Sequence, residues 1–175
     1  MPRLTADQKH TVSFTLNGRK VSGLAEPRTL LTDFLRAELG MTGTHVGCEH
    51  GVCGACTIQI DGKMARACLA LAVQTDGCDV RTVEGLSHDG ARLSVIQEAF
   101  REHHGLQCGF CTAGFLMTVD AFLKEKPDAS EEEVRDVLSG NLCRCTGYAP
   151  IIKAVLAAQK KLQAERTPNM EEINA

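Results

Sequence analysis

The sequence predicts an α+β protein of two domains, an N-terminal domain with a small mixed β-sheet and one helix and a C-terminal four-helix bundle. Two observations support this. Apolar residues alternate with the period of two typical of strands up to about residue 83, and then recur with the 3.6-residue period of helices from about residue 91 to about residue 162. Of the nine cysteines, four lie between residues 48 and 68, four lie between residues 108 and 145, and Cys78 stands alone. We expect a flexible N-terminus (1–10), a sheet domain (11–85), a linker (86–90), a helical domain (91–164) and a flexible tail (165–175).

The composition is that of an ordinary globular protein. A chain of 175 residues with 43% hydrophobic and 23% charged residues can bury a core. No apolar run reaches the roughly 20 residues that a membrane-spanning helix needs. The net charge of −3 offers no basic surface for nucleic acid. Many cysteines without an apolar leader segment indicate metal binding in a reducing compartment, and we expect a cytoplasmic protein.

Two hairpins and one helix account for the sheet domain. Residues 11–16 alternate polar and apolar side chains, Asn17-Gly18 suits a type I′ turn, and residues 19–23 return as the second strand. Leucine and phenylalanine at helical spacing predict a helix over 29–39, which Gly40 ends. Residues 57–60 and 63–66 form a second hairpin around Asp61-Gly62, and a strand over about 79–83 follows.

The helical domain is defined by its caps. The spacing of apolar residues predicts helices over 91–103 and 112–124, and Ser130 with Glu133 forms a capping box for a short helix over 131–138. Pro150 suits the first turn of a fourth helix that continues to about residue 164. The side chains expected in the core of the first two helices are Leu93, Ile96, Phe100, Phe115, Leu116, Val119, Phe122 and Leu123.

The first cysteine group has the spacing of an iron-sulfur site. Cys48, Cys53 and Cys56 follow the pattern C-x4-C-x2-C, with Cys68 as a distant fourth, which is typical of a plant-type [2Fe-2S] cluster. Four thiolates must converge while backbone N–H groups turn toward sulfur, and such a tight loop needs residues without a Cβ. The glycines at 47, 51 and 54 supply them.

Other sites for these thiols fit less well. Structural zinc sites pair two short cysteine units, whereas here three cysteines crowd one loop. Disulfides suit short secreted chains. A Rieske site would place histidines on one iron, but only His50 has a suitable neighbour, and we interpret it as a loop residue.

The second group lies at predicted helix starts. Cys108 and Cys111 precede the second helix, and Cys143 and Cys145 precede the fourth. The unpaired N–H groups and the positive dipole end of a helix N-terminus stabilise thiolates, so two such ends could form a second four-thiolate site. We interpret Cys78 as a packed free thiol that belongs to neither site.

The motifs at 47–57, 107–112 and 141–148 together resemble the small [2Fe-2S] subunit of the xanthine dehydrogenase and aldehyde oxidoreductase family of molybdenum hydroxylases. The resemblance covers residues from about 11 to 162, and over the first 85 residues the order of elements resembles the β-grasp of plant-type ferredoxins. It implies two [2Fe-2S] clusters, the first held by Cys48, Cys53, Cys56 and Cys68 and the second by Cys108, Cys111, Cys143 and Cys145.

The same resemblance implies the role of the chain and its partners. Electrons would pass from a large molybdopterin-binding subunit to a medium FAD-binding subunit or an external acceptor, in a heterotrimer or a dimer of heterotrimers. The cluster of the helical domain would lie nearer the molybdenum, with Gln107 and Cys145 next to the pterin. The alternative for Gln107 is that it caps the adjacent helix.

The residues agree with a chain that has no catalytic site of its own. It contains no Gly-rich dinucleotide motif and no nucleophile paired with a base. The pair His103-His104 at a predicted helix end is interpreted as solvated. The alternative function is a stand-alone two-cluster ferredoxin or a redox sensor, but a sensor needs an output module that this sequence does not show.

Overall fold

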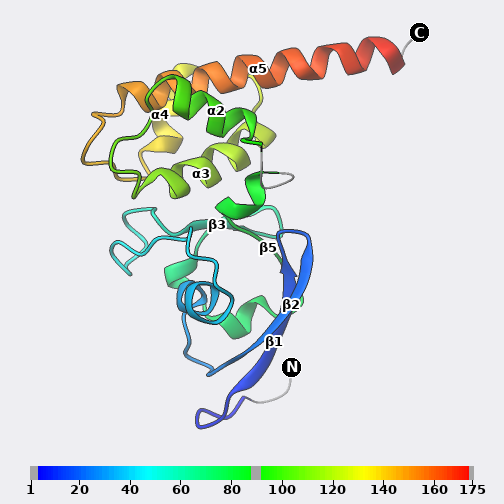
Figure 1. Ribbon diagram of the computed structural model, residues 1–175, viewed down its shortest axis with the longest axis vertical. Coiled ribbons are helices and arrows are strands. Elements are labelled where there is room, and N and C mark those ends of the chain that lie inside the picture. The colour runs from blue at the N-terminus through cyan, green and yellow to red at the C-terminus, as the bar shows by residue number, and fades with distance from the viewer. Residues whose placement is uncertain (1–3, 88–91, 174–175) are drawn as a thin grey trace.

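The computed structural model of the protein describes residues 4–87 and 92–173, and it stacks two domains on one another (Figure 1). The strands belong to the N-terminal domain and the long helices to the C-terminal one. The elements of the first domain are β1 (His10–Leu16), β2 (Arg19–Ala25), α1 (Leu31–Asp33), η1 (Phe34–Glu38), β3 (Thr57–Ile60), β4 (Lys63–Arg66), η2 (Ala67–Leu69), η3 (Ala72–Thr75), β5 (Asp79–Arg81) and η4 (Val83–Leu86). Among the described residues, no helix combines the length and the apolar character that crossing a membrane requires.

The sheet is mixed, with strand order β2-β1-β5-β3-β4. The β1–β5 pair is parallel and the other pairs are antiparallel. Both expected hairpins are present. Asn17 and Gly18 have φ of 50° and 79°, and Asp61 and Gly62 have φ of 50° and 77°, as two-residue turns with both central residues left-handed require.

The expected helix over 29–39 is present over Leu31–Glu38, and its second half widens into a π turn. The amide of Leu39 bonds to the carbonyl of Phe34 at 3.1 Å, five residues back. Phe34 and Leu35 are buried, whereas Leu39 is half-buried. Helix and sheet enclose a core made of Val12, Phe14, Leu16, Ala25, Leu31, Phe34, Leu35, Cys56, Ile58, Ala67, Cys68, Ala72 and Val80.

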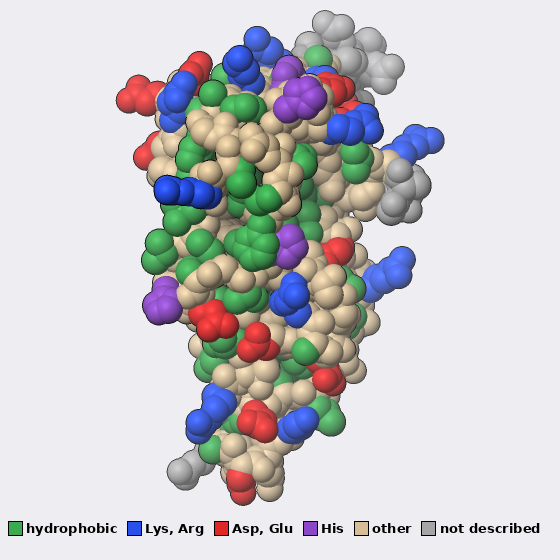
Figure 2. Space-filling model, turned by 60° about the vertical axis from the view of Figure 1, so that its left-hand side comes forward, with side chains coloured by type: hydrophobic (Ala, Val, Ile, Leu, Met, Phe, Trp, Pro, Cys, Tyr) green, Lys and Arg blue, Asp and Glu red, His purple; other side chains and the backbone are tan. Residues whose placement is uncertain are grey.

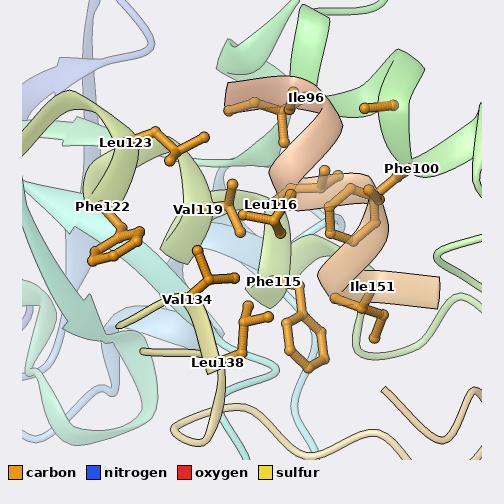
Figure 3. Packing of buried hydrophobic residues seen from close by; sticks show 14 of the residues in the cluster. Ile96, Phe100, Phe115, Leu116, Val119, Phe122, Leu123, Val134, Leu138 and Ile151 are labelled. Atoms are coloured by element: carbon orange, nitrogen blue, oxygen red, sulfur yellow. The ribbon is translucent and has the colours of Figure 1, made fainter. Parts of the chain in front are cut away.

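Within residues 92–173, four helices form the second domain: α2 (Val95–Glu102), α3 (Thr112–Glu125), α4 (Glu131–Leu138) and α5 (Ala149–Ile173). The predicted capping box of α4 is present, because Ser130 Oγ accepts from the Glu133 amide at 3.2 Å and Glu133 accepts from the Ser130 amide at 2.9 Å. Figure 3 shows the core between these helices, where Phe100, Phe115 and Ile151 face one another.

The first helix of this domain starts later than expected. It begins at Val95 because Ser94 and Gln97 form a capping box, with the Gln97 side chain 2.8 Å from the Ser94 amide. Leu93 therefore lies outside the helix and is 41% exposed, so the prediction that it joins the core is wrong. Residue 91, the expected first residue, lies outside the described residues.

The C-terminal tail also differs from the prediction. The fourth helix was expected to end at about residue 164, but α5 continues to Ile173, and residues 174–175 of the predicted tail lie outside the described residues. Residues 160–166 are Lys, Lys, Leu, Gln, Ala, Glu and Arg, which are all among the stronger helix formers, so nothing in this stretch ends the helix. The pattern of apolar residues fades there, so the sequence did not predict the additional turns of this helix.

The boundary between the domains lies close to Leu86. This residue, expected in the linker, is 2% exposed and packs in the helical core with Ile96 and Phe100. Residues 88–90 of the predicted linker lie outside the described residues. The chain thus already contacts the helical domain at the first residue of the predicted linker.

Helix α3 packs directly on strand β3. Gln59 of β3 is buried, and its side-chain amide donates to Asp120 of α3 at 2.8 Å. Asp120 also accepts from Lys124 at 2.7 Å and from Arg81 of β5 at 3.3 Å. These charge-assisted contacts satisfy a mostly buried carboxylate and join the two domains.

Candidate metal centres

The first cysteine group comes together around the β3–β4 hairpin. Cys48, Cys53 and Cys56 lie in the loop that leads into β3, and β4 returns the chain so that η2 places Cys68 beside them. Cys56 and Cys68 are buried, whereas Cys48 and Cys53 are half-buried. The hairpin thus brings Cys68 back beside the cysteine loop, as the sequence predicted.

The four thiols of this group lie in two pairs, Cys48 with Cys53 and Cys56 with Cys68. The backbone amides of Cys53 and His50 donate to Cys48 Sγ at 3.4 and 3.3 Å and lower the pKa of this thiol to about 6. Burial, with the neighbouring Cys56, raises the pKa of Cys68 to about 11. A bound metal ion deprotonates its thiol ligands outright, so both thiols could serve as thiolates.

The loop backbone leaves room beside the sulfur atoms. Gly51 and Gly54 have φ of 76° and 73°, a conformation that glycine adopts without strain. A Cβ at Gly47 would lie 3.0 Å from Cys53 Sγ, and a Cβ at Gly51 would lie 2.4 Å from the side chain of Leu69. Glycine is therefore required for the loop to curl around the thiols.

The second group lies between α3 and the loop that follows α4. Cys111 is the N-cap of α3, and Cys108 lies in the turn before it. Cys143 and Cys145 lie in the loop that precedes α5, which begins at Ala149, so they are not on the first turn of that helix. Cys108 and Cys145 are exposed, and their sulfur atoms are 3.5 Å apart. Cys111 pairs with Cys143.

Burial and hydrogen bonds give these thiols opposite pKa shifts. Burial raises the pKa of Cys111 to about 12, so the helix N-terminus alone does not stabilise its thiolate. Burial also acts to raise the pKa of Cys143, but hydrogen bonds from the hydroxyl of Thr146 at 3.1 Å, its amide at 3.5 Å, the Cys145 amide and the Cys111 thiol together lower the net pKa. The contact with Cys108 raises the pKa of Cys145.

The arrangement fits clusters of two irons. All nine cysteines are free. No three His, Cys, Asp or Glu side chains of the described residues converge closely enough to hold a single metal ion. A [2Fe-2S] cluster does not require three protein ligands on one metal ion, because each of its irons takes only two of the four thiolates. Two pairs of thiols at each site therefore match this donor set.

The two centres meet at a close contact between the domains. A Cβ at Gly114 of α3 would lie 2.1 Å from the carbonyl oxygen of Gly54, which lies between Cys53 and Cys56. The side chain of Asn141 is 1% exposed and donates to the same oxygen at 3.0 Å. Sequence reasoning missed Asn141, because a single polar residue before a cysteine motif carries no periodic signal.

Exposed apolar side chains lie near both centres. Val52 and Leu69 belong to the first, and Leu106, Phe110 and Leu142 belong to the second. Figure 2 shows apolar side chains gathered over the middle of the face on which the domains meet. Monomeric proteins leave few such side chains clustered without a partner, so this face suits an interface.

The remaining predicted residues lie at the surface. Gln107 is exposed, and α3 begins without a side-chain cap hydrogen bond, so the structure does not support the capping alternative. His50 is an exposed loop residue, and His103 and His104 are exposed at the end of α2, as interpreted from the sequence. Cys78 is half-buried against the core of the first domain, and burial raises the pKa of its thiol.

Two family models match the chain. Residues 14–77 match the 2Fe-2S iron-sulfur cluster binding domain, and residues 82–156 match the [2Fe-2S] binding domain. The matches divide the chain between residues 77 and 82, close to the domain boundary seen in the structure. The α+β fold with one iron-sulfur domain of each kind is therefore confirmed.

Similar proteins cover almost the same length. The chain is 58% identical to the caffeine dehydrogenase subunit gamma of Pseudomonas sp. (strain CBB1), over 83% of this chain and 89% of the relative. It is 56% identical to the nicotine 6-hydroxylase small subunit of Paenarthrobacter nicotinovorans, over 84% and 88%. Among solved structures, quinoline 2-oxidoreductase from Pseudomonas putida 86 contains a chain that is 52% identical, with a TM-score of 0.86 over 90% of this chain and 98% of that one.

Proposed function

Because the chain belongs to the small iron-sulfur subunits of the xanthine dehydrogenase and aldehyde oxidoreductase family, the molybdenum hydroxylases, it is an electron-transfer subunit, and we propose that it holds two [2Fe-2S] clusters that pass electrons from a molybdopterin subunit to an FAD subunit. The observation that carries the proposal is the pairing of thiols at two separate centres, Cys48, Cys53, Cys56 and Cys68 in one domain and Cys108, Cys111, Cys143 and Cys145 in the other.

The chain's own residues would set the properties of the two sites. A [2Fe-2S] cluster supplies the ability to accept and return one electron. Amide donors to sulfur, such as those of His50 and Cys53 at the first centre and Thr146 at the second, raise the reduction potential by stabilising negative charge. Because the donors and the burial differ, the two centres would have different potentials.

The exposure of the thiols supports a direction for electron flow. Cys108 and Cys145 of the second centre are exposed, whereas Cys56 and Cys68 of the first are buried. We assign the exposed face of the second centre, with Leu106 and Phe110 at its edge, to the large molybdopterin subunit. Electrons would enter there and leave from the first centre to the medium FAD subunit or an external acceptor.

The assembly and its substrate are further parts of the proposal. We expect a heterotrimer or a dimer of heterotrimers, in the cytoplasm, where nine free thiols would stay reduced. Caffeine, nicotine and quinoline, named for three similar proteins, are all nitrogen heterocycles, and we propose the same substrate class for this complex. Co-expression of this chain with the large molybdopterin subunit and the medium FAD subunit tests the assembly. In size-exclusion chromatography a subunit of the complex would elute with these partners, whereas a stand-alone ferredoxin or sensor would elute alone.

The function is tested by following the clusters during turnover. In the purified complex, a substrate of the large subunit should reduce both centres, as seen by optical bleaching and by electron paramagnetic resonance (EPR). The same substrate added to this chain alone should reduce neither, since the proposal assigns the oxidation of substrate to the large subunit. Reduction of the isolated chain by substrate would contradict the proposal.

Replacing Gln107 tests the entry point. Its side chain is exposed beside Cys108 and can both donate and accept hydrogen bonds, as a buried pterin edge requires. Leaving one such pterin group unpaired costs about 1–3 kcal/mol. Gln107→Ala should therefore slow reduction of the clusters by substrate in the complex, while iron content and thermal stability of the chain stay the same. If only the thermal stability falls, Gln107 has a structural role and electrons enter through Cys145 alone.

A further inference from the structure

A groove of about 610 Å³ lies beside the junction of the two domains, and none of the residues that line it is a cysteine. These residues come from β5, from η4, from the chain around the start of α2, from the second half of α3 and from α5. Figure 1 shows that α5 runs past the other helices of the bundle, and its residues 162, 165 and 166 form one wall of the groove. The volume lies within the range of roughly 300–1,000 Å³ that is typical of sites for small molecules.

The floor of the groove is apolar. Leu86, Ile96 and Leu123 are at most 5% exposed and belong to the helical core, so the groove reaches down to the edge of that core. Leu162 of α5 is half-buried, and Leu93, just before α2, is 41% exposed. An apolar group placed here would remove these leucine side chains from water, which is favourable.

The rim of the groove carries more positive than negative charge. Asp120 accepts from Lys124 at 2.7 Å and from Arg81 at 3.3 Å, so two cations share one carboxylate. The Lys124 side chain is 52% exposed, and Asp120 takes one of the three N–H donors of its ammonium group. On α5, Arg166 and Glu165 are exposed neighbours of opposite sign. An anionic group could therefore bind to Lys124 and Arg166 without displacing Asp120.

We propose that this groove binds an amphipathic monoanion, namely an organic carboxylate with an extended apolar body. The leucine floor would hold the body, and Lys124 and Arg166 would pair with the carboxylate, since a charge leaves water at low cost only when it is paired. Two cations on one carboxylate leave a single unit of positive charge, which suits one negative charge on the ligand. This inference goes beyond the proposed function and does not depend on the metal centres.

Decanoate is the probe for this site, with two control ligands. Decyltrimethylammonium has the same body with the opposite charge, and acetate has the carboxylate without the body. In isothermal titration calorimetry with the full-length chain, we expect saturable binding of one decanoate per chain, with the negative heat-capacity change that burial of apolar surface produces. Neither control should bind. Absence of saturable decanoate binding, or equal binding of the cation, would overturn the proposal.

Two adjacent positions on α5 test the charge preference in opposite directions. Arg166→Gln removes a cation from the groove and Glu165→Gln removes an anion, and both side chains are exposed, so neither change should disturb the fold. At low ionic strength, where charges are least screened, decanoate should bind several-fold more weakly to R166Q and several-fold more tightly to E165Q. Arg101→Gln is the matched control, because Arg101 is exposed on α2 and does not line the groove. Equal decanoate affinities of R166Q and R101Q would contradict the proposed site.

Leu93→Gln tests the apolar part of the groove. Because Leu93 lies outside the core, this variant should keep the parental Tm and bind decanoate several-fold more weakly. An unchanged affinity would exclude the groove as the site of binding. If the parental chain binds no decanoate and L93Q instead loses a subunit from the assembled complex in size-exclusion chromatography, the groove holds a segment of a partner chain, and the proposal of a small ligand is wrong.

Discussion

Gly114→Ala is expected to destabilise the protein and to disturb both centres. The added Cβ would lie 2.1 Å from the carbonyl oxygen of Gly54 and 3.0 Å from Asn141 Nδ2, so the backbones of the two domains must move apart. Overpacking of this kind typically costs about 1–3 kcal/mol, and a contact with backbone lies at the upper end because no side chain can rotate away. The gain in helix propensity offsets only about 1 kcal/mol.

The change should be visible as a lower Tm and as weaker magnetic coupling between the reduced centres by EPR. For a chain of this size, each kcal/mol shifts Tm by roughly 2–4 °C. Gly140→Ala is the matched control at the same interface, because its Cβ would lie 3.2 Å from the flexible end of Arg66. If Gly114→Ala has the Tm and the magnetic coupling of the control, the two domains are not in contact at Gly54.

Cys68→Ser is expected to remove the first cluster and leave the second. Cys68 supplies one of the two buried thiols of its centre, and a hydroxyl is a much weaker iron ligand than a thiolate. The second centre belongs to a domain with its own core, so it should assemble independently. Iron content should fall by about two irons per chain, and one of two EPR signals should disappear.

Cys78→Ser is the control for this loss. Cys78 is half-buried between η3 and β5, and it pairs with no cysteine in the described part of the chain. This variant should retain all its iron and both signals, with a stability cost of at most about 1–2 kcal/mol. If Cys78→Ser loses a cluster and Cys68→Ser keeps it, the fourth ligand of the first centre has been assigned to the wrong cysteine.

The sequence was sufficient for features that are local. The Asn17-Gly18 and Asp61-Gly62 turns and the capping box at Ser130 were correctly predicted, because each depends on residues within a few positions of one another. The cysteine groups could also be found, because the spacing of metal ligands can be seen in the sequence itself. The late start of α2 could have been found from Ser94 and Gln97, which form a capping box of the same kind as Ser130 and Glu133.

Contacts between distant segments were not predictable from the sequence. Nothing near Asn141 indicates that its side chain is buried against Gly54, 87 residues away. The contact of Leu86 with the helical core likewise arises only when the two domains pack. The fold and the cysteine groups therefore followed from the sequence, whereas the connection between the two centres required the structure.

The most direct test of the two-cluster proposal is the EPR spectrum of the fully reduced protein, recorded with its iron and acid-labile sulfide content. Thiol pairs with different burial and different amide donors at the two centres predict two distinguishable signals, with about four irons and four sulfides per chain. A single signal from one cluster, or stoichiometric zinc without labile sulfide, would contradict the assignment of both centres.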